Sequence, residues 1–314
     1  MILIRRARLT VVAAALLGAA APSSNAGTRL QVLGADGRWR TWWAGGTVPN
    51  GTLAGAVRWR AARPGLEWGE LPIAADVGRA LPALRVRVVV ARVDPSRVAL
   101  ALHAAAAPEG GAGPWDLGRA PADAALALNA GQFTDAGPWG WVVHRGREVQ
   151  PPGAGPLSAA LVVDDRARAR VVPADSIAAL RAEGTVAEAV QSYPMLLDGD
   201  GELPTALRAS GRGVDLAHRD ARLVACELRD GRLLLALTRF AAPADALGDA
   251  LGGVPLGLTV PETAALASAL GCRRAVMLDG GLSAQLLVRD ADGTEHRWEG
   301  LRRVPLGLVG VARP

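Results

Sequence analysis

The stretch Ala275-Val276-Met277-Leu278-Asp279-Gly280-Gly281-Leu282-Ser283 is an apolar run that ends in one carboxylate and two glycines. Consecutive apolar residues are typical of a strand that is buried on both faces of its sheet. Glycines directly after such a strand permit backbone angles, and a close approach of a ligand, that side chains would block. The stretch therefore predicts a covered sheet with Asp279 at its edge, although Asp-Gly is also a common turn sequence.

A polar group beside an apolar run occurs twice more in the chain. Asn129 follows one such run, and His218-Arg219-Asp220-Ala221-Arg222 directly precedes another. Because alternate residues of a strand face the same way, we expect Asp220 and Arg222 on one face and Arg219 on the other. An aspartate beside a guanidinium stays ionised, but the spacing equally fits a strand-end salt bridge that adds little stability.

Taken in order, these segments resemble sequence blocks of the phosphodiester glycosidase family over roughly residues 81–314. The family block Asn-Gly-Gly-Phe-Phe is matched at Asn129 and Gly131, and the Gly-Pro-x-Leu segment is matched at Gln191 to Leu196. Arg222 matches the arginine of Arg-Thr-Ala-x-Gly. The block Gly-x-Thr-x-x-Glu is matched at Gly257, Thr259 and Glu262, and the block Leu-Asp-Gly-Gly-Gly-Ser is matched at Leu278 to Ser283. The chain departs from these blocks at Ala130, Gln132, Leu223, Cys226 and Leu282. Such departures are typical of a subfamily, so the sugar specificity of the typical enzyme does not carry over to this chain.

The resemblance implies hydrolysis of a sugar-1-phosphodiester at the anomeric carbon. It implies catalytic roles for Asp279, Asp220 and Glu262, with one carboxylate activating water or facing an oxocarbenium-like centre. Arginine contacts would stabilise the charge on the departing phosphate. Substrate contacts are implied for Asn129, Gln132, Gln191, Arg219, Arg222, Gly280, Gly281 and Ser283.

Several of these residues also have an ordinary structural interpretation. Thr259-Val260-Pro261-Glu262 fits a capping box, in which the Glu262 carboxylate accepts a hydrogen bond from the amide of the first residue. Amides such as Asn129 commonly satisfy loop backbone when they are buried. Two other functions stay open: a noncatalytic glycan-binding protein that uses its tryptophans, and a hydrolase of phosphate-free glycans.

The composition indicates a globular chain, since 50% of the 314 residues are hydrophobic and 21% are charged. The formal charge of +5 includes Arg5, Arg6 and Arg8, so no strong basic excess indicates nucleic-acid binding. These arginines precede an apolar segment and the small residues Ser24-Asn25-Ala26. The pattern predicts a signal peptide at residues 1–26 and export to the periplasm or beyond, with no membrane anchor after cleavage.

Residues 27–80 form a distinct stretch, rich in Gly, Pro and Trp, that the family resemblance does not reach. Its tryptophans are Trp39, Trp42, Trp43, Trp59 and Trp68. Tryptophans can stack on sugars, but packing against a core is the commoner role and the one we expect here. The sequence thus predicts an N-terminal extension at 27–80, followed by a phosphodiester glycosidase-like domain at 81–314.

Turn residues divide the chain after residue 80 into short apolar runs, which is typical of strands. We expect a hairpin between residues 84–93 and 98–102, across Asp94-Pro95-Ser96-Arg97. A second hairpin is expected between residues 222–228 and 233–237, which an Asp-Gly pair separates.

Helix signals are fewer than strand signals. Asp175 is expected to cap residues 176–183, and Thr259 is expected to open a helix that ends near Gly271. The order of elements predicts an α+β fold, a sheet-dominated mixed α/β domain with few helices.

Cys226 and Cys272 are the chain's two cysteines. In an exported protein they would form a disulfide or serve as two small buried side chains, and the sequence leaves both open. No Cys or His pair has the spacing of metal ligands, so neither a metal nor another cofactor is expected. The expected partner is a sugar-phosphate or glycan substrate, and the oligomeric state is left open.

Overall fold

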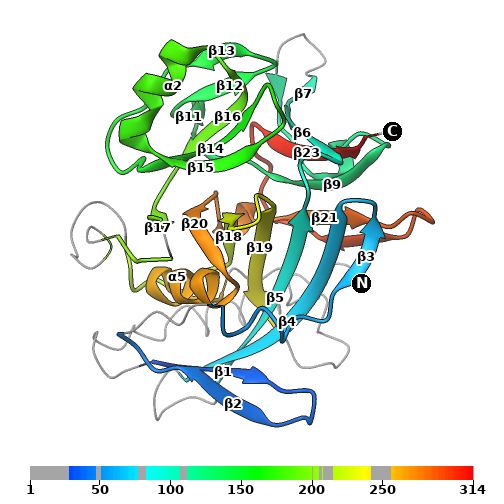
Figure 1. The fold of residues 1–314 in the computed structure, drawn as a ribbon, viewed down its shortest axis with the longest axis vertical. Helices are drawn as coiled ribbons and strands as arrows, with labels where there is room; N and C mark the ends of the chain where they lie inside the picture. Colours follow the sequence, from blue (N-terminus) through cyan, green and yellow to red (C-terminus); the bar gives the residue numbers. More distant parts are fainter. Residues whose placement is uncertain are drawn as a thin grey trace, which may run out of the picture.

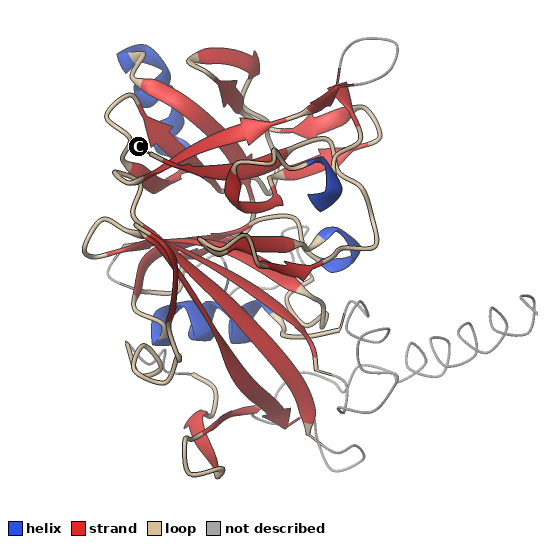
Figure 2. Cartoon of the chain, turned by 90° about the vertical axis from the view of Figure 1, so that its right-hand side faces the viewer, coloured by secondary structure: helices blue, strands red, loops and turns tan. Residues whose placement is uncertain are grey.

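The computed structural model describes residues 28–46, 51–76, 83–106, 112–199, 201–204, 207, 215–241 and 256–313. The expected signal peptide at residues 1–26 lies outside them. Strands dominate this part of the chain, and two α-helices lie beside them (Figure 1, Figure 2). The predicted sheet-dominated α+β fold with few helices is confirmed.

The largest sheet has nine strands in the order β17-β20-β18-β19-β5-β4-β1-β2, with β3 paired to β4. They are β1 (Arg29–Leu33), β2 (Trp39–Trp43), β3 (Arg60–Arg63), β4 (Leu66–Asp76), β5 (Leu84–Val93), β17 (Met195–Leu197), β18 (Arg222–Leu228), β19 (Leu233–Phe240) and β20 (Cys272–Met277). The expected hairpin of residues 222–237 is present, because β18 and β19 pair from Arg222↔Thr238 to Glu227↔Leu233.

Two five-stranded sheets have the orders β13-β12-β16-β14-β15 and β22-β21-β9-β23-β6. Their strands are β6 (Val98–His103), β9 (Ala124–Asn129), β12 (Val142–His144), β13 (Arg147–Gln150), β14 (Ala159–Asp164), β15 (Ala169–Pro173), β16 (Val186–Ser192), β21 (Leu286–Arg289), β22 (Glu295–Trp298) and β23 (Gly307–Ala312). Two short pairs are β7 (Ala105–Ala106) with β8 (Ala112–Gly113) and β10 (Gln132–Thr134) with β11 (Gly137–Trp139).

The large sheet is buried on both faces because its central strands are apolar at nearly every position. On one face, Leu223 of β18 and Leu235 of β19 pack in a core shared with the five-stranded sheets. On the other, Val224 and Leu234 pack in a core shared with helix α5 (Val260–Ala269). The predicted covered sheet is therefore present.

The two helices differ in how they begin. α5 starts with the predicted capping box, in which the Thr259 amide donates to Oε2 of Glu262 at 2.9 Å. α2 (Ile177–Glu183) has no side-chain cap, and the cap expected from Asp175 is wrong because this residue lies within the 3-10 turn η2 (Ala174–Ser176).

In the described part of the chain, no helix has the length and apolar character to cross a membrane.

The hairpin expected between residues 84–93 and 98–102 is not formed. Strand β5 is paired on one side with β4 and on the other with β19, so both of its edges are occupied. The chain therefore leaves the large sheet at Asp94 and continues as β6, which pairs with β23 in another sheet.

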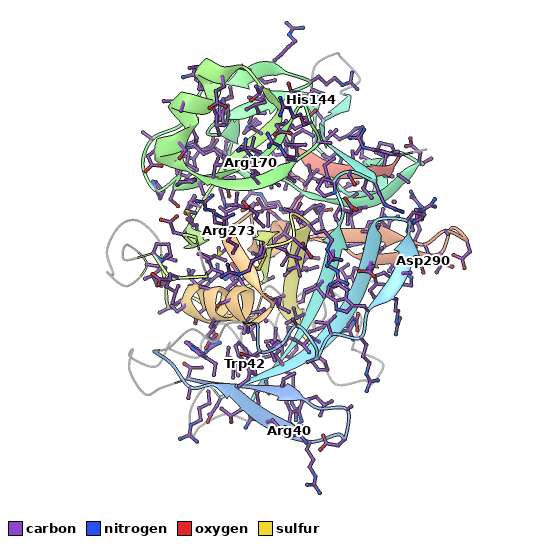
Figure 3. The ribbon with its side chains drawn as sticks, in the orientation of Figure 1. Arg40, Trp42, His144, Arg170, Arg273 and Asp290 are labelled. Carbon is purple, nitrogen blue, oxygen red and sulfur yellow. A yellow bond between two sulfur atoms is a disulfide. The ribbon has the colours of Figure 1, made fainter. Side chains whose placement is uncertain are left out.

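The tryptophan-rich segment at 27–80 is not a separate appendage in the structure. Its strand β4 pairs with β5 from Leu66↔Val93 to Ala75↔Leu84, so the sheet continues across the boundary expected at residue 80. Trp68 is buried, and Trp42 on β2 packs against the core on the α5 side (Figure 3). Packing against a core is thus the role of four of these tryptophans, namely Trp42, Trp43, Trp59 and Trp68.

Cys226 and Cys272 form a disulfide between β18 and β20, with their Cα atoms 5.6 Å apart. The bond lies on the face of the large sheet that α5 covers. It joins the two neighbouring strands that position the candidate site, since β18 begins next to Asp220 and β20 ends shortly before Asp279.

Candidate functional site

The Asp279 carboxylate lies just beyond the end of β20 and has one oxygen without a partner. Its Oδ2 atom is buried and makes no hydrogen bond within the described part of the chain. The pKa of Asp279 is raised to about 6, chiefly by burial and to a smaller extent by the charge of Asp220, and this value already includes the opposing effects of a hydrogen bond from Ser283 and of the charge of Arg302. A buried carboxylate oxygen without a partner is costly to the fold and is typical of functional sites.

Asp220 is the second carboxylate at this position, and two glycines bring it there. A Cβ atom on Gly281, whose φ is +59°, would lie 2.9 Å from Oδ2 of Asp220. A Cβ atom on Gly280 would lie 2.6 Å from the carbonyl oxygen of Ala221. The two glycines therefore allow the 279–283 turn to pack directly against the chain at Asp220.

The pKa of Asp220 is also raised, chiefly because burial disfavours its charged form. The charges of Arg222 and His218 oppose this shift, and His218 Nε2 lies 3.7 Å from Oδ2 of Asp220. The site thus contains two carboxylates whose pKa values are both raised, and the value of about 6 for Asp279 suits proton transfer near neutral pH.

Arg222 is buried, and its guanidinium is occupied by backbone. Its Nε donates to the Leu258 carbonyl at 3.0 Å, and its Nη2 donates to the His218 carbonyl. Arg222 therefore acts on Asp220 through its charge and does not form the direct ion pair expected from the strand pattern. These two hydrogen bonds hold the segments at His218 and Leu258 together.

Arg219 and Glu262 form a bidentate pair, with both Nη–Oε distances at 2.7 Å. Glu262 is almost fully buried and also caps α5 through its contact with the Thr259 amide. The contact with Thr259 is the structural role that the capping-box pattern predicts, and the ion pair with Arg219 adds to it. The resemblance implied substrate or catalytic roles for both residues, but here each is occupied by the other.

Asn129 and Gln191 are buried amides that organise the loops around the site. The Asn129 side chain donates to the Asp279 carbonyl at 2.7 Å and accepts from the Gln285 amide at 3.0 Å. The Gln191 side chain accepts from the amides of Trp141 and Gly153, both at 2.9 Å. Asn129 therefore fixes the turn that bears Asp279, whereas Gln191 supports a neighbouring loop.

The short β10–β11 hairpin reaches the site through its side chains. Gln132 Nε2 lies 3.5 Å from Ser192 Oγ, which in turn donates to the Met277 carbonyl next to the end of β20. Trp139 packs edge-on against Tyr193 with ring centroids 5.5 Å apart.

Sequence patterns did not indicate two residues of the site, Arg302 and Tyr193. Arg302 is exposed, and its guanidinium lies 4.8 Å from the Phe133 ring centroid. Tyr193, the chain's single tyrosine, has a pKa that is raised by burial and by the charge of Asp279. Tyr193 lies inside the matched segment 191–196 and could have been found there, but no local pattern marks Arg302.

Within the described residues, no group of three or more His, Cys, Asp or Glu side chains is arranged to hold a metal ion. The side chains of the site offer two carboxylates, an exposed guanidinium, a phenol and a hydroxyl. Carboxylates and a cation in this combination suit hydrolysis of a bond next to an anionic group.

The sequence profile of the phosphodiester glycosidase family matches residues 122–310 of this chain. This range contains each of the candidate site residues described above. No curated protein sequence matches the chain significantly.

Solved structures share the fold at low sequence identity. The zebrafish N-acetylglucosamine-1-phosphodiester alpha-N-acetylglucosaminidase catalytic domain, auto-inhibited by its pro-peptide, is 16% identical with a TM-score of 0.61, over 81% of this chain and 86% of that one. A hypothetical protein from Synechocystis is 17% identical with a TM-score of 0.52, over 82% of this chain and 64% of that one. Because the family profile spans more than half of the sequence, the chain belongs to the phosphodiester glycosidase family.

Proposed function

We propose that this protein hydrolyses a sugar-1-phosphodiester at the anomeric carbon, and that Asp279 is the carboxylate that acts there. The observation that supports this most directly is the buried Oδ2 of Asp279, which has no hydrogen-bond partner in the described chain. A carboxylate with a pKa of about 6 is largely ionised at pH 7 and still has a high proton affinity. Both properties suit a general base or an electrostatic partner of a cationic centre.

In the proposed reaction, water adds to the anomeric carbon and the bond from this carbon to the phosphate oxygen breaks. Asp279 accepts a proton from the water, and the phosphate leaves as a phosphomonoester that takes the bonding electrons. Asp220 lies in the same site, and its charge helps to keep the proton affinity of Asp279 high. Phosphate is a good leaving group, so the reaction has little need of a separate general acid.

Arg302 is the residue best suited to contact the phosphate. Its side chain is exposed, its guanidinium lies over the Phe133 ring, and its positive charge lowers the pKa of Asp279. Guanidinium groups match phosphate oxygens in geometry and charge. The arginines expected in this role, Arg219 and Arg222, are occupied by Glu262 and by backbone carbonyls.

The zebrafish relative is named for action on an N-acetylglucosamine-1-phosphodiester. This name supports the class of substrate proposed here, while the departures at Gln132 and Leu282 favour a different sugar or a different group beyond the phosphate. We also propose that residues 1–26 direct export, so that the substrate lies outside the cytoplasm.

The proposal is tested by following a panel of sugar-1-phosphodiesters with phosphorus NMR. Wild-type protein is expected to release free sugar and a phosphomonoester, and Asp279→Asn is expected to reduce kcat by at least about a hundredfold, as loss of a general base typically does. Asp230→Asn is the matched control, because Asp230 lies on the β18–β19 turn, at the opposite end of β18 from Arg222. Turnover by Asp279→Asn close to that of the control would exclude Asp279 from the reaction.

A further inference from the structure

Exposed apolar side chains are rare on the described surface, and two of them lie beside the site. The large hydrophobic residues that are exposed are Leu301 at 67%, Val149 at 65% and Leu282 at 46%. Leu282 is part of the 279–283 turn that bears Asp279, whereas Val149 lies on β13 in a different sheet. We call Leu282 and Leu301 together the leucine rim.

Backbone hydrogen bonds hold the two residues of the leucine rim together. The amides of Leu301 and Arg302 both donate to the Leu282 carbonyl, at 2.7 and 2.9 Å. Gly300 packs against the same segment, because a Cβ atom there would lie 3.0 Å from the carbonyl oxygens of both Leu282 and Ser283. The rim is therefore a built feature of the site and not the tip of an isolated loop.

Arg302 links the leucine rim to the reacting groups. It follows Leu301 directly, its guanidinium stacks over Phe133, and its charge acts on Asp279. The carboxylate, the cation and the apolar surface are therefore supplied by two hydrogen-bonded segments, 279–283 and 300–302. A substrate with matching groups has a sugar carbon, a phosphate and an apolar group.

The chemistry of the rim distinguishes between possible groups beyond the phosphate. A sugar in this position would be recognised by aromatic faces and by hydrogen-bond donors and acceptors. Leucine side chains offer neither, and instead favour a ligand whose own apolar surface leaves water on binding. Leu282 also stands at a glycine position of the family block, so this apolar side chain is a feature of the present chain.

We infer that the leucine rim binds an alkyl or lipid alcohol esterified to the far side of the substrate phosphate, so that the substrate is a sugar-1-phosphoalkyl diester. This inference rests on the proposed function and specifies the substrate of the same site. Hydrolysis of such a diester releases free sugar and an alkyl phosphate.

The inference is tested by comparing two diesters of one sugar that differ only in an ethyl or an octyl group, below the concentration at which the octyl compound forms micelles. The ratio of kcat/KM for octyl over ethyl is expected to be about ten or more in the wild type, because the extra methylenes become buried. In the double variant Leu282→Ser/Leu301→Ser this ratio is expected to fall towards one. Val149→Ser is the matched control and is expected to keep the wild-type ratio.

A ratio near one in the wild type, or a ratio that the double variant leaves unchanged, would overturn the inference while leaving the proposed function intact. Failure of the wild type to hydrolyse either diester would instead count against the proposed function. The rim is then tested by calorimetric binding of octyl phosphate and ethyl phosphate, with tighter binding of octyl phosphate expected only when both leucines are present. Light scattering that shows a wild-type dimer and a monomeric double variant would assign the rim to self-association and overturn the inference.

Discussion

Asp279 is held in a place that disfavours its charged form, and this has a measurable effect on stability. Burial raises its pKa from 3.8 to about 6, so between these pH values the folded state binds more protons than the unfolded state. The free energy of unfolding therefore decreases as the pH rises through this window, and the loss is complete above pH 6. A site that costs stability in this way is typical of a functional residue.

We predict that Asp279→Asn stabilises the protein at pH 7 by up to about 3 kcal/mol, since each pKa unit corresponds to roughly 1.4 kcal/mol. The gain is expected to be nearly lost at about pH 3, below the unfolded-state pKa of 3.8, where Asp279 is mostly protonated in both states. Urea unfolding at both pH values measures it. Asp230→Asn is the control with the opposite sign, because hydrogen bonding to Arg232 lowers the pKa of Asp230. An Asp279→Asn protein that is no more stable at pH 7 than the wild type would contradict the account of this residue.

At the scale of elements, helix α5 depends on Glu262 for its start and for its contact with Arg219. Replacing Glu262 with Ala removes the cap and leaves the Arg219 guanidinium without its carboxylate. We expect a loss of about 3 kcal/mol in the free energy of unfolding, since loss of one partner of a buried pair is costly. Glu262→Gln is expected to recover part of it, because the amide oxygen still accepts from Thr259.

Thermal unfolding of both Glu262 variants, beside Glu202→Ala at an exposed position, measures this effect. If the Glu262→Ala protein is as stable as the wild type but has lost turnover, the role of Glu262 is catalytic and not structural.

The disulfide between β18 and β20 also stabilises the arrangement of elements around the site, because these strands lead to Asp220 and Asp279. We expect Cys226→Ala/Cys272→Ala to lower the free energy of unfolding by about 2–4 kcal/mol, the usual range for a disulfide that closes a long loop. A reductant should lower the melting temperature of the wild type and leave the double variant unchanged. If the reductant has no effect on the wild type, the two cysteines serve only as buried side chains.

Strand pairing shows where sequence is sufficient for prediction and where it is not. The β18–β19 hairpin is predictable because its Asp-Gly turn and both strands are local. The turn at Asp94 has equally clear local signals, yet β5 and β6 do not pair, because distant strands already occupy both edges of β5. Local sequence indicates where the chain turns, but it does not indicate which strand pairs with β5.

At the scale of the whole molecule, the candidate site forms where the ends of strands from different sheets meet. Asp279 and Asp220 could be predicted because each stands next to an apolar run, and Asn129 ends another such run. Arg302 and the leucine rim could not, because their relation to Asp279 comes from contacts between separate segments. The family resemblance implied substrate contacts for Arg219 and Arg222, and only the structure shows that Arg219 donates to Glu262 and Arg222 to backbone carbonyls.

The central claim is that the bond to the anomeric carbon breaks with the help of Asp279. The most direct measurement is hydrolysis of a sugar-1-phosphodiester in oxygen-18-labelled water by wild type and Asp279→Asn. We expect wild-type protein to place the label in the sugar and to leave the phosphomonoester unlabelled in its phosphorus NMR spectrum, and we expect Asp279→Asn to form both products at least about a hundredfold more slowly. Label in the phosphomonoester would show attack at phosphorus and contradict the claim.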